Sequence, residues 1–463
     1  MRTAGSVFKA LREQIVDDIA DGRTASFDFS WPELTEFNWA SDWFDSAARG
    51  DAAPAVVWSG VDGVSQQITF EELRACSDRV AGWLVRQGVG RGTRILISLC
   101  EVAALWEIQL AALKLGAIVV PAPPMAAGAE LMNVLAFSGA TVVITDPDSA
   151  QDVRPASTWT GITVGGQVPG WSSYEESYSH AVRYRPRAIH QSRAPFLLEY
   201  SGGSEEGSQL RGWLHSHYAC AVGRLTDLYF TRLRPGQRYV AAAPPGSMEH
   251  LCFSFLGPLT AGATTVVMGQ KEKRSAVDVA AQAHKEGARS AYVSMAIMTD
   301  PDAATSVQHT PLSEVELLSS LTVESLARTD PGPCAPVVRG GGAARRAWPA
   351  TRGWPATPGN VRWGMRHHQT STGLMVRSSG TAGDEDIRTT ALPGHRVSVV
   401  SPTTGAPAEA GDLWLGLSGW SDGSTPTTSL YGDAHRLPGV GALRTGLQGR
   451  RMPDGSVRLT ADR

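Results

Sequence analysis

The chain has 463 residues, of which 42% are hydrophobic and 19% are charged, and its formal net charge at pH 7 is -3. This length and composition are typical of a globular protein with two or three packed units. The weakly negative charge gives no reason to expect a nucleic acid or an anionic membrane surface as a partner.

The cysteines are five in number, are scattered, and show no Cys-x-x-Cys spacing. They are Cys76, Cys100, Cys220, Cys252 and Cys334. This pattern predicts reduced thiols and neither a disulfide framework nor a metal centre. The N-terminus has no apolar signal segment, and no run approaches the ~18 apolar residues of a membrane span. We therefore expect a soluble, cytoplasmic protein.

The N-terminal region predicts a helix followed by an aromatic cluster. Apolar residues at helical spacing predict an amphipathic helix over residues 6–19. Trp31, Trp39, Trp43 and Phe44 then follow within a short stretch. They form either a stacking platform for a ligand or buried packing at the start of a helix, and their size favours the packing.

Short apolar runs alternate with helical patterns between residues 55 and 145. We predict strands at 56–58, 66–70, 94–98, 117–120 and 141–145, and helices at 70–87 and 103–115. Strands that alternate with helices over ~30 residues per unit favour a parallel, doubly wound sheet. The polar, turn-rich residues 147–192 are predicted to form a surface connection.

A Ser- and Gly-rich stretch covers residues 199–217. It follows the apolar run 194–198 and precedes the helix-like residues 218–230, which predicts a loop between a strand and a helix. Such a loop can direct several backbone N–H groups at an anion.

The same stretch contains two acidic residues, Glu205 and Glu206. Their carboxylates would be repelled by an anionic ligand by about 4 kcal/mol per charge pair at ~4 Å and an effective dielectric near 20. The alternative is that both turn outward while the neighbouring glycines still form an anion loop.

The second half of the chain continues the succession of strands and turns. Residues 239–246 and 261–268 predict strands of a second α/β unit. Residues 300–358 are the least regular. Short alternating strands return between residues 396 and 459.

These segments resemble the adenylate-forming superfamily of acyl-CoA synthetases, adenylation domains and luciferases, and its acetyl-CoA-synthetase-like branch most. The resemblance is carried by Thr69-Phe-Glu-Glu-Leu, by Leu105-Trp-Glu, by Lys114-Leu-Gly-Ala-Ile-Val-Val-Pro121 and by the frame of 199–217. It implies an α/β fold like the large N-terminal domain of these enzymes. That fold has two doubly wound subdomains, here 1–190 and 191–375, and a small β-barrel subdomain, here 376–463. The chain ends near the family's hinge, so the resemblance also predicts that the C-terminal lid domain is absent.

The resemblance places the nucleotide-binding positions of the family on Ser204, Arg211, Gly341, Gln369 and Leu447. Gln369 stands where the family has a magnesium-binding glutamate, and a neutral amide is a poor ligand for a hard dication. Leu447 stands where the family has a ribose-binding aspartate, and leucine accepts no hydrogen bond. Gly341 belongs either to a turn near adenine or to a plain turn. We therefore expect no ATP or magnesium cofactor and no resident metal.

The acyl pocket of the family falls on residues that are chemically reactive. His367 and His368 lie where the family lines this pocket, and His250 is expected to point into the same cleft. Histidine is suited to general base catalysis near neutral pH, and Cys252 or Ser247 is a candidate nucleophile. The alternative is that Cys252 is a small core residue and that His250 packs on an aromatic ring.

Three functions remain open from the sequence. The first is an enzyme of specialised metabolism that binds a carboxylic acid, or its CoA- or carrier-linked thioester, and carries out ATP-independent hydrolysis, cyclisation or acyl transfer. The second is a non-catalytic protein that binds a synthetase or a carrier protein. The third is an AMP-forming acid ligase with Arg211 as phosphate ligand and a lid from another polypeptide. The reactive residues at the substituted positions favour the first.

Overall fold

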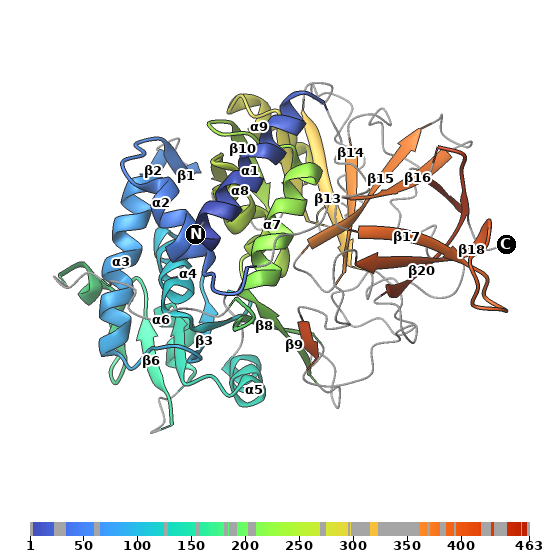
Figure 1. Cartoon of the computed structure of the whole chain (residues 1–463). Coiled ribbons are helices and arrows are strands. Elements are labelled where there is room, and N and C mark those ends of the chain that lie inside the picture. The colour runs from blue at the N-terminus through green and yellow to red at the C-terminus, as the bar shows by residue number, and fades with distance from the viewer. Residues whose placement is uncertain are drawn as a thin grey trace.

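The structure is a computed structural model, and its fold is shown in Figure 1. It describes residues 3–22, 34–59, 65–124, 128–153, 158–179, 184, 192–201, 210–268, 275–294, 297, 315–322, 361–367, 371–379, 386–392, 395–417, 427–429, 442–454 and 456–460. Strand pairing within these residues forms two sheets, of eight and of thirteen strands.

The smaller sheet is doubly wound around β3. Its order is β19-β9-β8-β4-β3-β5-β6-β7. These strands are β3 (Arg94–Ser98), β4 (Ile118–Pro121), β5 (Val142–Thr145), β6 (Thr160–Thr163), β7 (Ser172–Ser173), β8 (Pro195–Ser201), β9 (Arg211–Ser216) and β19 (Thr427–Ser429). From β3 the chain passes to its parallel neighbour β4 and then crosses to β5 on the other side of β3. The winding direction therefore reverses at β3.

The larger sheet has the same winding around β10. Its order is β17-β18-β20-β21-β16-β15-β14-β13-β12-β10-β11-β1-β2. Its first strands are β1 (Pro54–Ser59), β2 (Ser65–Thr69), β10 (Arg238–Ala242), β11 (Thr264–Met268), β12 (Ser290–Val293) and β13 (Glu316–Thr322). From β10 the chain passes to β11 on one side and then to β12 on the other, and both pairs are parallel.

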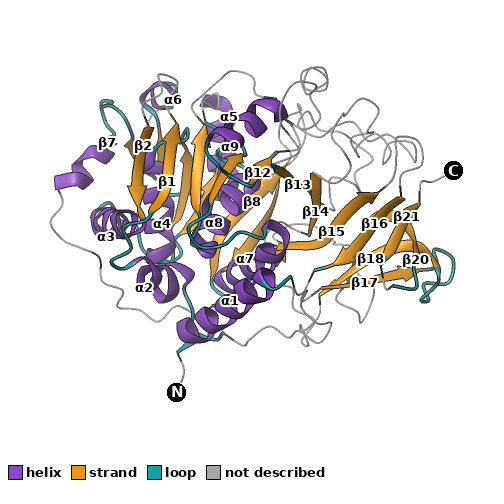
Figure 2. Cartoon of the chain, turned by 90° about the horizontal axis from the view of Figure 1, so that it is seen from above, coloured by secondary structure: helices purple, strands orange, loops and turns teal. Residues whose placement is uncertain are grey.

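The far end of the larger sheet is antiparallel. It comprises β14 (Val361–His367), β15 (Ser371–Ser379), β16 (Asp386–Ala391), β17 (His395–Val400), β18 (Ala410–Leu417), β20 (Ala442–Arg451) and β21 (Val457–Thr460). β14 pairs in parallel with β13 and antiparallel with β15. The view from above shows these strands continuing the sheet away from the helical part of the molecule (Figure 2).

Helices lie between the two sheets and on their outer faces (Figure 1). The elements are α1 (Ala4–Ala20), η1 (Trp39–Phe44), α2 (Asp45–Ala48), α3 (Phe70–Arg86), α4 (Ala103–Leu115), α5 (Gly128–Ser138), α6 (Pro147–Gln151), η2 (Tyr174–Ser179), α7 (His217–Thr231), η3 (His250–Leu256), α8 (Gly257–Ala261) and α9 (Ala276–Lys285). η1 and η3 are π-helical, and η2 is a 3₁₀ helix. In the part that the structure describes, no helix combines the length and the apolar character that crossing a bilayer requires.

The central hydrophobic core fills the space between the sheets, and each sheet also has an outer core. In β3, Ile95 and Ile97 contribute to the central core, whereas Leu96 contributes to the outer core beneath α5. In β10, Tyr239 contributes to the central core and Val240 to the outer core beneath α9. The alternation follows the two-residue period of a strand, and both faces are apolar because both are covered.

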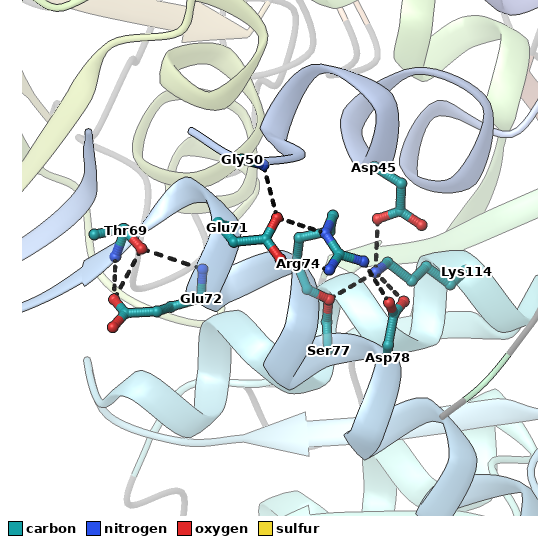
Figure 3. A network of polar contacts seen from close by, with 9 residues as sticks. All are labelled: Asp45, Gly50, Thr69, Glu71, Glu72, Arg74, Ser77, Asp78 and Lys114. Carbon is teal, nitrogen blue, oxygen red and sulfur yellow. Dashed lines mark hydrogen bonds and ion pairs between the residues drawn. The ribbon is translucent and has the colours of Figure 1, made fainter. Parts of the chain in front are cut away.

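A buried ion network joins α2, α3 and α4 (Figure 3). Nζ of Lys114, which is 0% exposed, lies 2.7 Å from Oδ1 of Asp45 and donates to Oδ1 of Asp78 at 2.6 Å and to the carbonyl oxygen of Arg74 at 3.1 Å. Arg74 in turn forms ion pairs with Asp78 and Glu71. Lys114 thus donates two hydrogen bonds and shares its charge with two carboxylates, and the network fixes the three helices relative to one another.

Most of the elements predicted from sequence are present. The predicted helix 6–19 is α1, and Thr69 begins α3 with a capping box that includes Glu72. Trp39, Trp43 and Phe44 are buried against one another, which confirms the packing interpretation for these three residues. Trp31 lies outside the described residues. Two doubly wound sheets and an antiparallel C-terminal part are the predicted fold class.

Two predictions about connections are wrong. Residues 147–192 are not only a surface connection, because β6 and β7 extend the smaller sheet there. The stretch 199–217 does not run from a strand to a helix, because β8 and β9 pair as an antiparallel hairpin and α7 begins only at His217. The residues between these two strands, 202–209, lie outside the described part.

Strand pairing crosses the predicted subdomain boundaries at residues 190 and 375. β1 and β2 join the larger sheet through β11, and β8 and β9 join the smaller sheet through β4. β19 pairs with β9, so a segment near the C-terminus completes the smaller sheet. The division at these two residues stays a prediction.

Candidate functional site

The carboxyl ends of the two central strands meet. Each of β3 and β10 is the strand at which the winding of its sheet reverses, and ligands of open α/β sheets bind outside the carboxyl ends at such points. The residues after β3 and those after β10 touch through side chains, and the backbone after β4 touches the backbone after β10. We therefore take this junction as the candidate site.

Glu101 and His250 form the central contact of the junction. Glu101 follows β3, and His250 follows β10 and begins η3. Nε2 of His250 lies 2.5 Å from Oε1 of Glu101, and the two side chains are 1% and 12% exposed.

Trp106 completes the contact from α4. Its indole N–H donates to Oε2 of Glu101 at 3.3 Å, and its ring lies edge-on to His250 with centroids 6.2 Å apart. Trp106 is in turn packed edge-on between Trp58 and Phe255. Both oxygens of the Glu101 carboxylate thus have partners, and the aromatic packing restricts how the imidazole can rotate.

Backbone contacts join the loop after β4 to the loop after β10. A β-carbon on Gly246, whose φ is +80°, would overlap the carbonyl group of Ala122, so the loops after β10 and β4 are in direct contact. The backbone N–H of His250 donates to Oγ of Ser247 at 3.1 Å, and this hydroxyl donates to the carbonyl oxygen of Pro244 at 2.6 Å. Ser247 therefore shapes the turn that places His250.

Cys252 lies two residues after His250 in η3. It is 2% exposed and belongs to the central core. Its carbonyl oxygen accepts a hydrogen bond from Nη1 of Arg224 at 2.9 Å, and Arg224 is paired with Asp227. This burial favours the alternative that Cys252 is a packing residue, and its proposed role as nucleophile stays a prediction.

His367 ends β14 on the same carboxyl edge of the larger sheet as His250, because β10, β12, β13 and β14 are parallel. Three strand spacings separate β14 from β10, about 14 Å. The structure gives no side-chain position for His367. The predicted site residues Ser204, Gly341, His368 and Gln369 lie outside the described residues.

Arg211 begins β9 opposite Ser201, next to the segment 202–209. Its backbone therefore follows the predicted phosphate loop closely in sequence. Its side chain is not among those that the structure describes. Leu447 lies within β20, again without a described side chain. Among the described residues, no cluster of three or more His, Cys, Asp or Glu side chains is arranged to hold a metal ion.

Sequence reasoning did not single out Glu101 or the role of Trp106. Glu101 stands alone after a strand, and Trp106 appeared only as part of a motif that marks the fold. The signal that could have found Glu101 is its position directly after the central strand of a doubly wound sheet, where functional side chains gather.

Comparison with known proteins gives the family. Residues 43–419 match the family model described as AMP-binding enzyme. The acetyl-coenzyme A synthetase of Bacillus subtilis is 27% identical over 219 residues, which are 44% of this chain and 36% of that protein. The salicyl-AMP ligase / salicyl-S-ArCP synthetase of Mycobacterium tuberculosis is 28% identical over 239 residues, 48% of this chain and 41% of that protein. The match thus spans less than half of either relative.

The fold agrees with solved structures. The acyl-CoA synthetase of Brucella canis superimposes with a TM-score of 0.69 at 19% identity, covering 97% of this chain and 79% of that one. At this identity the likeness shows the fold alone. The family model, however, covers most of the chain and includes both central strands, Glu101 and His250. The chain belongs to the AMP-binding enzyme family, the adenylate-forming superfamily that its motifs indicated.

Proposed function

We propose that this chain binds a small carboxylic acid, or its thioester with CoA or a carrier protein, at the Glu101–His250 pair and acts on the acyl group without adenylating it. The observation that carries the proposal is this buried carboxylate–imidazole pair at the junction of the two central strands. A histidine oriented by a carboxylate is a recurrent arrangement for general base catalysis.

The reaction that fits this pair best is thioester hydrolysis. His250 would take a proton from water as the water oxygen bonds to the acyl carbonyl carbon. The carbon–sulfur bond then breaks, and the departing sulfur takes the proton back from the imidazolium. A free carboxylic acid and a free thiol leave, and no nucleotide is consumed.

Substitutions at the nucleotide positions support the ATP-independent part of the proposal. Gln369 stands in place of the family's magnesium-binding glutamate, and Leu447 in place of its ribose-binding aspartate. Glu205 and Glu206 add negative charge to the predicted phosphate loop. Phosphoryl transfer depends on positioning and charge neutralisation, so these changes act together against adenylation.

One observation favours a second function, an AMP-forming acid ligase. The chain belongs to a family whose matched relatives include a synthetase and an AMP ligase. In this case Arg211, at the start of β9, would be the phosphate cation, since arginine binds phosphate well. A non-catalytic protein that binds a synthetase or carrier protein is the third outcome of the test.

The test is thiol release from acetyl-, benzoyl- and salicyl-CoA by the purified chain, with and without ATP and magnesium. We expect release without ATP, and a loss of about 100-fold or more in His250→Ala, as for removal of a general base. His284→Ala is the matched control, since His284 is an exposed residue of α9 on the outer face of the larger sheet. It should leave the rate unchanged.

Two results would contradict the proposal. Release of pyrophosphate from ATP in the presence of a carboxylic acid would favour the ligase. In that case saturating ATP at about 100 times its Kd should add about 2.7 kcal/mol to the free energy of unfolding. No thiol release, no pyrophosphate release and a stable complex with a carrier protein would favour the non-catalytic function.

A further inference from the structure

η3 is a π-helical segment within a longer helix. The helical residues run without a break from Met248 through η3 to the end of α8 at Ala261. Where η3 ends, the backbone N–H of Gly257 donates to the carbonyl oxygen of Cys252, five residues earlier. An α-helix pairs residues four apart, so η3 accommodates an extra residue. Segments of this kind lie frequently at functional sites, and this one begins at His250.

Gly257 fits the π-helical form because it has no side chain. A β-carbon at this position would lie 2.7 Å from the carbonyl oxygen of Cys252, which is too close. Its φ of −62° is ordinary for a helix, where alanine is intrinsically favoured over glycine. Glycine is therefore required here by the approach of the Cys252 carbonyl group and not by the backbone conformation.

A second donor reaches the same carbonyl group from outside the helix. Nη1 of Arg224 in α7 donates to the carbonyl oxygen of Cys252 at 2.9 Å, and its Nη2 lies 2.8 Å from Oδ2 of Asp227. The two charged side chains are 1% and 2% exposed. A buried ion pair adds little net stability, because the cost of removing both charges from water offsets their attraction. This pair does, however, direct a guanidinium donor at a carbonyl group that closes the π turn.

The far end of the same helix is anchored by α1. Arg12 donates through Nε to the carbonyl oxygen of Thr260 at 3.0 Å and through Nη2 to that of Ala261. If η3 relaxed to an α-helix, the change would therefore fall on its first residues. Because an α-helix has 3.6 residues per turn, the loss of one residue from a turn rotates them by about 100°. His250 would then leave its contact with Glu101.

We propose that Arg224 is a positioning residue of the candidate site: its hydrogen bond to the Cys252 carbonyl group holds η3 in the π-helical form, which places His250. The consequence for an acyl substrate rests on the proposed function. The placement of His250 does not, and it is measurable in the free protein.

The first test removes the donor without leaving a buried charge unpaired. Arg224→Met/Asp227→Leu replaces the ion pair by apolar side chains, an exchange that buried pairs often tolerate. The matched control is Arg238→Met/Glu286→Leu, which removes a more exposed pair at the amino end of β10.

The ring signal of His250 reports its placement. It is recorded in a ¹H–¹³C correlation spectrum of the full chain with ¹³C-labelled histidine rings and is assigned by its loss in His250→Ala. We expect the signal to shift in Arg224→Met/Asp227→Leu, because the imidazole leaves the aromatic ring of Trp106, and to stay in place in the control. An unshifted signal in the folded double variant would overturn the proposal.

Gly257→Ala tests the π turn independently of the ion pair, and it keeps the test valid if the double variant does not fold. The new β-carbon should displace the Cys252 carbonyl group and shift the His250 signal. If Gly257 were an ordinary helix residue, alanine would stabilise the helix and leave the signal unchanged. That result would also overturn the proposal.

Thiol release gives the last measurement. We expect kcat to fall by about 100-fold in Arg224→Met/Asp227→Leu with KM nearly unchanged, because a displaced general base affects the chemical step and not the binding of the acyl group. The control should keep the wild-type kcat. A shifted His250 signal together with no thiol release by the wild-type chain contradicts the proposed function and leaves the positioning by Arg224 standing.

Discussion

The backbone of Gly246 lies against the carbonyl group of Ala122, with no room for a side chain between them. Gly246 belongs to the loop after β10, and Ala122 to the loop after β4. This contact joins the carboxyl edges of the two sheets next to the Glu101–His250 pair. The positive φ of +80° at Gly246 adds a second reason why glycine is required there.

Gly246→Ala should therefore destabilise the chain more than alanine at an open left-handed glycine. Gly236 is the matched control, since its φ is +73° and nothing lies within 4 Å of an added β-carbon. We expect a loss of about 1–2 kcal/mol for Gly236→Ala from backbone strain alone. For Gly246→Ala the free energy of unfolding should fall by about 1–3 kcal/mol more, because the new β-carbon would overlap the carbonyl group of Ala122. Urea unfolding with unchanged m-values measures both, and equal losses would contradict the close contact.

Lys114→Met should lower the free energy of unfolding by about 3–5 kcal/mol. The reason is that it leaves the buried Asp45 and Asp78 carboxylates without their shared cation (Figure 3). Lys9→Met is the control. Lys9 pairs with Glu13 at 3.9 Å on the surface, with both side chains more than half exposed, so its removal should cost under about 1 kcal/mol. A loss in Lys114→Met no larger than in Lys9→Met would argue against the network.

The Asp45 carboxyl gives a prediction about pH. Burial raises its pKa from the ordinary value of 3.8 to about 6, although Lys114 lowers it in part. The folded chain therefore binds this proton more tightly than the unfolded chain between these pH values, so the free energy of unfolding falls as pH rises through them. As pH rises over this range, the free energy of unfolding of the wild-type chain should fall by roughly 1–3 kcal/mol relative to that of Asp45→Asn. If the difference in the free energy of unfolding between the two proteins did not change with pH, the raised pKa of Asp45 would be contradicted.

The Glu71 carboxyl should change the free energy of unfolding with pH in the opposite direction to Asp45. The hydrogen bond from Arg74 is the main cause that lowers the pKa of Glu71 from 4.5 to about 2. Stability from this carboxylate is therefore present above pH 4.5 and is lost as pH falls towards 2. The Glu71 side chain is 37% exposed, so solvent screening keeps the effect small. The measurement is acid unfolding of Glu71→Gln, which should show a weaker loss than the wild-type chain on acidification.

Cys252→Ala tests the nucleophile prediction. If Cys252 is a packing residue, as its burial favours, thiol release should persist at near the wild-type rate. The free energy of unfolding should then fall by about 1–2 kcal/mol from the small cavity. Loss of release in a folded Cys252→Ala chain would restore the nucleophile role. Ser247→Ala gives the parallel test for the hydroxyl, which here supports the backbone of His250.

The sequence by itself determined the local elements around the two central strands. The apolar runs at 94–98 and 117–120, the helix 103–115 and the cap at Thr69 follow from local patterns, because hydrophobic period and capping chemistry act within a few residues. The family motifs also indicated the fold class. One of them begins at Lys114, which in the structure joins α4 to α3 through Asp78 and Arg74.

Only the tertiary structure decided which strands pair and which side chains meet. The local pattern at 54–69 is the same whether β1 and β2 join the nearer or the farther sheet, and the pairing with β11 depends on contacts with residues about 200 positions away in sequence. Glu101 and His250 likewise carry no mark of their partnership in the chain. They meet because each follows the central strand of its own sheet, and packing of the two sheets on a shared core brings those strand ends together.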